Sequence, residues 1–112
     1  MRAQAEKSNR LICPEEITLQ VISGRWKVLI LKELIQGVKR FGELHRALHG
    51  ITQKVLTQQL REMEEDGIVH RQVHLQVPPK VEYSLTHKGE NLKLILDAMH
   101  EWGVKYLIPN LG

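Results

Sequence analysis

The segment ITQKVLTQQLREMEEDG, residues 51–67, decides the fold of this chain. Thr52 is a good N-cap and Gly67 a good C-terminal stop, so the segment predicts a helix that runs to Asp66. One side of this helix is apolar, with residues spaced by four and then by three: Leu56, Leu60 and Met63. We expect that side to pack into a core.

The opposite side of the same helix is polar and is free to contact a partner. By the same helical spacing it carries Lys54, Thr57, Gln58 and Arg61. The acids gather at the far end of the segment: Glu62, Glu64, Glu65 and Asp66. We therefore expect an anionic partner to meet the first turns of the helix, away from these acids.

The neighbouring segments predict a helix-turn-helix followed by a hairpin. Residues 41–48 form an expected short helix, and residues 49–51 alone separate it from the next helix. Residues 69–77 and 81–85 are rich in β-branched side chains. The intervening Pro78-Pro79-Lys80 cannot continue a strand ladder, so the two stretches predict a two-stranded hairpin, or wing.

Further elements complete the expected order. Pro14 begins a helix that ends near residues 23–24, residues 26–36 form a central apolar helix, and residues 38–40 a very short strand. Thr86 caps a long final helix. Its apolar stripe consists of Leu92, Ile95, Leu96, Met99, Trp102 and Tyr106. The predicted fold class is mainly α with a small β-hairpin (α+β), a winged helix-turn-helix, and the stripe exceeds what one small domain needs.

Length and composition agree with one globular domain. The chain has 112 residues, of which 42% are hydrophobic and 26% charged. We divide it into a flexible polar leader, residues 1–10, and a winged helix-turn-helix domain, residues 11–108. No stretch is long enough to cross a bilayer, and the polar N-terminus has no apolar signal core, so we expect a cytoplasmic protein.

The polar face of the helix expected within residues 51–67 has the chemistry that reads double-stranded DNA. Glutamine pairs with adenine, and arginine or lysine with guanine, each good pair contributing roughly 1–3 kcal/mol of discrimination. The net charge of +3 and the pI near 9.2 favour an anionic partner only mildly, so the position of the charges decides. The candidate DNA-binding residues are Thr52, Gln53, Lys54, Thr57, Gln58 and Arg61 on the helix and Lys39, Arg40 and Lys80 beside it.

Two functions stay open from the residues alone. In the first, the polar face reads DNA and the wing contacts the backbone or minor groove. In the second, the winged helix is a protein-interaction module without specific DNA binding, and its polar face is only solvated. Arg71 is a weaker wing candidate than Lys80, because the acids that close the preceding helix are potential partners for it.

The ordered motifs resemble the HxlR-type family of bacterial winged-helix transcriptional regulators. They are Cys13-Pro14, ISGRWK at 22–27, RFGEL at 40–44, LTQQLREMEEDG at 56–67 and VPPKVEYSLT at 77–86. The resemblance extends from Cys13 to about Tyr106. It implies a homodimer that binds a roughly palindromic operator as repressor or activator, joined through the first and last helices. The implied interface residues are Ile17, Val21, Leu92, Ile95, Leu96, Met99, Trp102 and Tyr106.

Cys13 is the single cysteine of the chain and precedes the expected first helix. A helix start favours the reactive thiolate, whereas Glu15 and Glu16 oppose it. Some members of the family that the chain resembles sense disulfide stress, quinones or aldehydes through a cysteine at the matching position. The alternative is a small apolar residue at the dimer interface.

The sequence predicts neither a metal site nor catalysis. His45 and His49 are four residues apart on an expected helix, without a third ligand nearby, and His70 and His74 lie about 13 Å apart if they share a strand. A phosphate-binding glycine loop and a nucleophile motif are both missing from the sequence. We therefore expect a protein that is not an enzyme and needs no cofactor.

Overall fold

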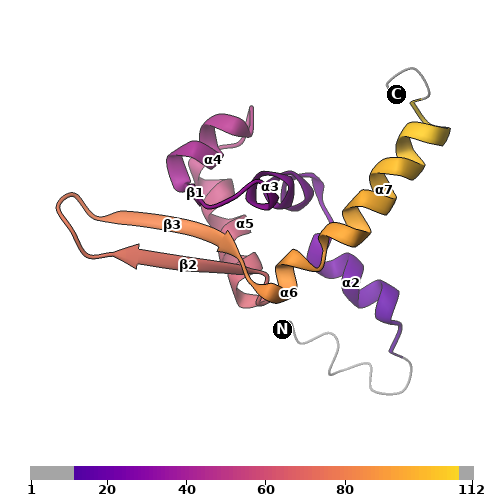
Figure 1. Cartoon of the computed structure of the whole chain (residues 1–112), viewed down its shortest axis with the longest axis horizontal. Coiled ribbons are helices and arrows are strands. Elements are labelled where there is room, and N and C mark those ends of the chain that lie inside the picture. Colours follow the sequence, from indigo (N-terminus) through magenta and orange to yellow (C-terminus); the bar gives the residue numbers. More distant parts are fainter. Residues whose placement is uncertain (1–11, 109–112) are drawn as a thin grey trace.

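The computed structural model describes residues 12–108 and confirms the predicted fold class, a mainly helical domain with a small antiparallel sheet (Figure 1). The predicted leader, residues 1–10, lies outside the described residues. The elements are α2 (Pro14–Ile22), α3 (Arg25–Ile35), β1 (Lys39–Arg40), α4 (Phe41–Ala47), α5 (Gln53–Glu65), β2 (Val69–His74), β3 (Lys80–Leu85), α6 (His87–Glu90) and α7 (Lys93–Tyr106).

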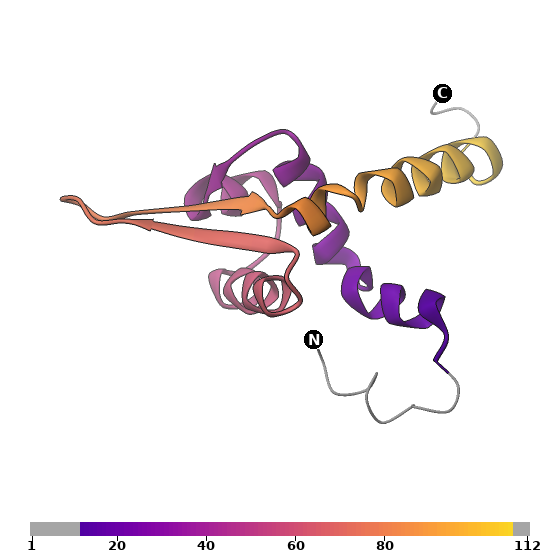
Figure 2. The ribbon, with the colours of Figure 1, turned by 60° about the horizontal axis from the view of Figure 1, so that its bottom comes forward.

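The sheet consists of β1, β3 and β2 in that spatial order, with both pairings antiparallel. The β2–β3 hairpin extends from the body as a long wing, and α2 and α7 extend from the opposite end of the molecule (Figures 1 and 2). The register of the β2–β3 hairpin pairs Val69 with Leu85 at the base and His74 with Lys80 near the tip. The wing and the two terminal helices are therefore well separated.

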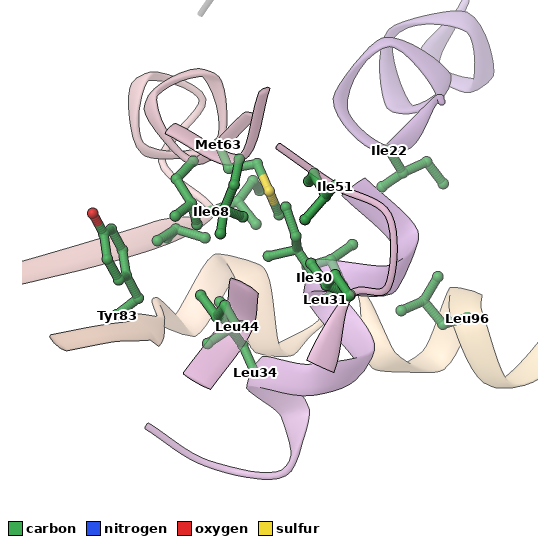
Figure 3. Packing of buried hydrophobic residues seen from close by; sticks show 14 residues of the cluster. Ile22, Ile30, Leu31, Leu34, Leu44, Ile51, Met63, Ile68, Tyr83 and Leu96 are labelled. Carbon is green, nitrogen blue, oxygen red and sulfur yellow. The ribbon is translucent and has the colours of Figure 1, made fainter. Parts of the chain in front are cut away.

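The core forms around α3, which was predicted to be the central helix. Ile30 and Leu31 are almost completely buried, and the inward residues of α5 pack against the same cluster. Ile22 from α2 and Leu96 from α7 lie at one end of the cluster (Figure 3). The most deeply buried large side chains are Ile30, Leu31, Leu44, Leu56, Leu60, Met63 and Ile68. The predicted packing side of α5 is thus confirmed.

Both ends of α5 follow from local chemistry, as predicted. The Thr52 hydroxyl accepts a hydrogen bond from the Val55 amide at 3.1 Å, which satisfies a free donor of the first turn. At the other end Gly67 has a φ of 76°, a left-handed conformation that glycine adopts without a steric cost. The helix therefore presents the same residues to the core and to the outside as its spacing predicted.

The hairpin and the last helix differ from their predicted bounds. β2 ends at His74, three residues earlier than expected, and β3 already begins at Lys80. Thr86 caps the short helix α6, not the long final helix. Between α6 and α7 the backbone includes hydrogen bonds from one residue to the third residue before it, as in the 3.0 Å bond from the Leu92 amide to the Gly89 carbonyl. A tighter turn of this kind changes the direction of a helix, and α7 begins anew at Lys93.

Within residues 12–108, no helix combines the length and the apolar character needed to span a bilayer.

Candidate nucleic-acid interface

The polar side of α5 opens onto a shallow concavity of about 700 Å³. The structure brings five of the predicted DNA-binding residues together there: Gln53, Lys54, Thr57, Gln58 and Arg61. Phe41, at the start of α4, also lines the concavity. Lys54, Gln58 and Arg61 are exposed, so their side chains can reach a partner without any change in the fold.

The two predicted threonines already use their hydroxyls within the helix. Thr52 accepts the capping hydrogen bond described above, and the Thr57 hydroxyl donates to the Gln53 carbonyl at 2.8 Å. Thr57 is also half-buried. The amide and cationic side chains of α5 are therefore better placed to contact a partner than its hydroxyls.

Lys39 and Arg40 lie outside this concavity, in β1. Lys39 is half-buried and pairs across the sheet with Tyr83. Arg40 is exposed at the N-cap of α4, and its backbone amide donates to Oε1 of Glu43 at 2.7 Å. Of the two side chains, that of Arg40 is the more accessible.

Lys80 is the first residue of β3, whereas the sequence predicted it in the turn between the two strands. Side chains alternate between the faces of a strand, so the register places Lys80 on one face with His74 and Glu82. Nζ of Lys80 lies 3.9 Å from Oε2 of Glu82, and Nε2 of His74 lies 2.7 Å from Oε1 of the same carboxylate. The charge of Lys80 is therefore offset within the wing.

Arg71 lies on the other face of the wing, opposite Tyr83 in the register. Together with Thr57, Arg61 and Glu64, these two residues line a second concavity of about 310 Å³ beside α5. The acids that close α5 do not form a salt bridge with Arg71 among the described residues. Sequence reasoning ranked Arg71 below Lys80, although its position two residues after the apolar Val69 indicated the inner face of the strand.

A buried lysine was missed from the sequence. Lys27 is 4% exposed on α3, and its Nζ lies 2.6 Å from Oε1 of Glu62 on α5. The missed signal was its spacing, because Lys27 shares the helical face of Ile30, Leu31 and Leu34 and a cation on that face requires an anionic partner.

Two of the acids at the end of α5 lie nearer to the predicted DNA-binding residues than expected. Glu62 and Glu65 line the larger concavity beside α5. They reach it because a step of four or seven residues from Gln58 returns to the same side of a helix. The charge of Glu62 is offset by Lys27, so Glu65 is the acid that an anionic partner would approach.

Hydrogen bonds from α6 and its N-cap hold the C-terminal end of α5 in place. Nζ of Lys88 donates to the Asp66 carbonyl at 2.8 Å, and the Thr86 hydroxyl donates to the Gly67 carbonyl at 2.6 Å. A Cβ atom at Gly89 would lie only 2.3 Å from the Ile68 carbonyl oxygen, so α6 packs directly on the backbone. Because α6 leads into α7, the last helix is connected physically to the end of α5.

Cys13 is the N-cap residue of α2 and is half-buried. Its Sγ donates a hydrogen bond to Oε1 of Glu15 at 3.4 Å. Glu15, which was expected to oppose formation of the thiolate, is therefore in contact with the thiol.

The predicted interface residues of α7 differ in exposure. Leu96 is buried in the core of its own chain and Leu92 is half-buried, whereas the rest of the stripe is exposed. The exposed fractions are 38% for Ile95, 48% for Met99, 57% for Trp102 and 60% for Tyr106. On α2, the predicted Ile17 and Val21 are half-buried.

The predicted histidine pairs do not form a cluster with other ligands. His45 lies on α4, but His49 comes after the end of that helix. His70 and His74 both lie on β2, as expected. In the described part of the chain, three or more metal-ligating side chains do not come together anywhere.

Comparison with known proteins identifies the family. Residues 21–110 match the family model described as HxlR-like helix-turn-helix. The uncharacterized HTH-type transcriptional regulator YybR of Bacillus subtilis (strain 168) is 56% identical over 95 residues, which cover 85% of this chain and 76% of YybR. YdeP of the same organism, which has the same description, is 53% identical over 94 residues, covering 84% of this chain and 73% of YdeP.

A solved structure extends the similarity to three dimensions. The redox regulator HypR in its reduced form is 55% identical, with a TM-score of 0.80 over 83% of this chain and 92% of HypR. Its oxidized form gives 56% identity and a TM-score of 0.77 over 83% of this chain and 96% of HypR. The chain therefore belongs to the HxlR-like helix-turn-helix family and is a DNA-binding transcriptional regulator, not an enzyme.

Proposed function

We propose that this protein acts as a homodimer on a roughly palindromic operator, with α5 of each copy in a major groove. The observation that carries the proposal is the concavity on the outer side of α5, which gathers donors and acceptors suited to base edges. The helix is held firmly on its other side by deeply buried residues, so its outer face is presented as a rigid unit. We propose that Gln53, Lys54 and Gln58 face the bases, and that Thr52 and Arg40 lie near the backbone.

The exposed apolar residues of α7 support the dimer. Leu96 is the one buried residue of this helix, although the helix has 14 residues, and an isolated helix of that length is marginal in water. Each large apolar side chain that a partner covers contributes about 1.5–3 kcal/mol. A second copy, packed through α2 and α7, would cover Met99, Trp102 and Tyr106 at once.

The two-fold axis of such a dimer sets the spacing of the operator. Two copies of α5 that enter successive major grooves lie about 34 Å apart, which is one turn of DNA. Operator fragments with half a turn inserted between the half-sites should therefore bind much more weakly. Binding that does not depend on the spacing would contradict the dimer model.

The DNA-reading face is tested by the triple variant Lys54→Ala, Gln58→Ala and Arg61→Ala. Fluorescence anisotropy with a selected operator should show a loss of affinity of at least a hundredfold, because several base and phosphate contacts disappear together. A matched control removes an exposed lysine and an exposed glutamine at the C-terminal end of α3, Lys32→Ala and Gln36→Ala, and should bind normally. If a well-folded triple variant kept full affinity, α5 would not be the reading helix.

Salt separates this function from that of a protein-interaction module. A DNA reader that makes six or more phosphate contacts loses about 10³–10⁵ in affinity between 50 and 200 mM salt. An apolar protein interface changes little over the same range. Steep salt dependence therefore supports DNA binding, and its absence supports the alternative.

We further propose that Cys13 makes DNA binding responsive to oxidants or electrophiles. The similarity to HypR, described in a reduced and an oxidized form, favours this role. Because the chain has one cysteine, any disulfide must join Cys13 to a second molecule, either another copy or a small thiol. A Cys13→Ser variant should bind DNA equally well before and after treatment with diamide, and a response that persisted in this variant would exclude the cysteine.

A further inference from the structure

We propose that Arg61 and Arg71 together bind one phosphate of the DNA backbone in the concavity between α5 and β2. This inference rests on the proposed function and joins in one site two residues that the sequence suggested only separately. The two arginines come from different elements, the third turn of α5 and the third residue of β2, and both line the smaller concavity.

The register of the wing places Arg71 on the side of α5. Arg71 pairs with Tyr83, which is 8% exposed and belongs to the core cluster. The face of the hairpin that carries these two residues is therefore continuous with the protein interior and with α5. Figure 2 shows α5, seen nearly end-on, next to β2 at the base of the wing.

The chemistry of the concavity suits an oxyanion. Arg61 and Arg71 are exposed, and within residues 12–108 neither side chain makes a hydrogen bond or a salt bridge. Their guanidinium groups each carry five donors in a planar arrangement that fits phosphate oxygens in a bidentate manner. Glu64 lines the same concavity and leaves it with a net positive charge of one.

Arg61 also lines the larger concavity, so it lies on the ridge between the two. Gln53, Lys54 and Gln58 occupy the first turns of α5, which enter the groove most deeply in a helix-turn-helix protein. A residue in the third turn lies closer to the edge of the groove, where the phosphates are. We therefore assign Arg61 to the backbone together with Arg71.

Lys80 provides the contrast within the same hairpin. It lies on the opposite face, and Glu82 offsets its charge from 3.9 Å while also contacting His74. The wing thus has one face whose cation is free to bind an anion and one face whose cation is already compensated. The proposal predicts different behaviour for these two cations.

The test compares Arg71→Gln with Lys80→Gln in salt titrations of operator binding. Each phosphate contact contributes about 0.9 to the slope of log K against log salt concentration. Arg71→Gln should make this slope less steep by about the same amount. It should also weaken binding to operator and to random DNA alike by about tenfold. Lys80→Gln should leave both the slope and the affinity close to those of the wild type.

Two further measurements locate the phosphate. In a double-mutant cycle, Arg61→Gln with Arg71→Gln should lose less affinity than the product of the two single losses, because both side chains bind one group. A neutral methylphosphonate can replace one phosphate of the operator at a time. At one position per half-site, the wild type and Arg71→Gln should then bind with equal affinity.

The outcomes distinguish this inference from the proposed function. If Lys80→Gln lowered the slope and Arg71→Gln did not, or if Arg71→Gln weakened binding to the operator alone, the phosphate site would be refuted while DNA binding stood. If the wild type bound DNA without any dependence on salt, the proposed function itself would fail. Thermal unfolding of each variant confirms that the fold is unchanged.

Discussion

Nζ of Lys27 on α3 lies 2.6 Å from Oε1 of Glu62 on α5, and it joins the central helix to the helix that carries the candidate DNA-binding residues. The lysine side chain is 5% exposed and the glutamate side chain 32% exposed. A buried ammonium group without an anion nearby is costly, so the orientation of α5 depends in part on this ion pair.

We expect the two partners of this ion pair to differ in their importance for stability. Glu62→Ala leaves the lysine buried and uncompensated, and should lower the free energy of unfolding by about 3 kcal/mol, whereas Lys27→Met should cost less. Urea denaturation at one protein concentration measures both. The double variant Lys27→Met, Glu62→Ala should recover most of the loss, and a strict sum of the single losses would contradict the explanation.

Gly89 should not tolerate a side chain. Because a Cβ atom at this position would lie 2.3 Å from the Ile68 backbone oxygen, Gly89→Ala should force α6 away from the end of α5. We expect a loss of about 1–3 kcal/mol, measured by chemical denaturation. Gly42→Ala is the control, because its Cβ would meet only the flexible end of Arg46, at 3.3 Å, and it should be close to neutral.

A charge on the exposed face of α7 should separate the proposed dimer. Trp102→Glu places a carboxylate at a side chain that is 57% exposed in the single chain, so the monomer should still fold. Sedimentation analysis should show a monomer, and affinity for a two-half-site operator should fall by at least tenfold. Gln36→Glu adds the same charge at an exposed position outside α2 and α7 and should remain dimeric.

The apolar side chains at the tip of the wing should contribute almost nothing to the free energy of unfolding. Leu75 is 95% exposed and Val77 fully exposed, so replacing either with serine should change the free energy of unfolding by at most about 0.5 kcal/mol. Leu60→Ala, at a side chain that is 2% exposed, should cost about 2–5 kcal/mol. A comparable loss at Leu75 would mean that the tip packs against something in the free protein.

Much of the fold was predictable because the signals are local. The helix from Thr52 to Gly67 has a cap, an apolar spacing and a glycine stop within one short segment, and all three act as predicted. The same spacing placed Gln58 and Arg61 correctly on the outer side of α5. The break before α7 was not predicted, because Thr86 is a good cap for either helix and the close packing of α6 on Ile68 involves a distant part of the chain.

The amino-acid sequence by itself determined which residues of α5 point outward, since a helix has a fixed period and its ends were marked by Thr52 and Gly67. Only the tertiary structure decided which charges are free. Glu62 is compensated by a lysine 35 positions earlier, and Arg71 rather than Lys80 adjoins α5 because of the register of two strands. A charge interacts with whatever is near it in space, and the residues nearest in space to these groups are distant in the sequence.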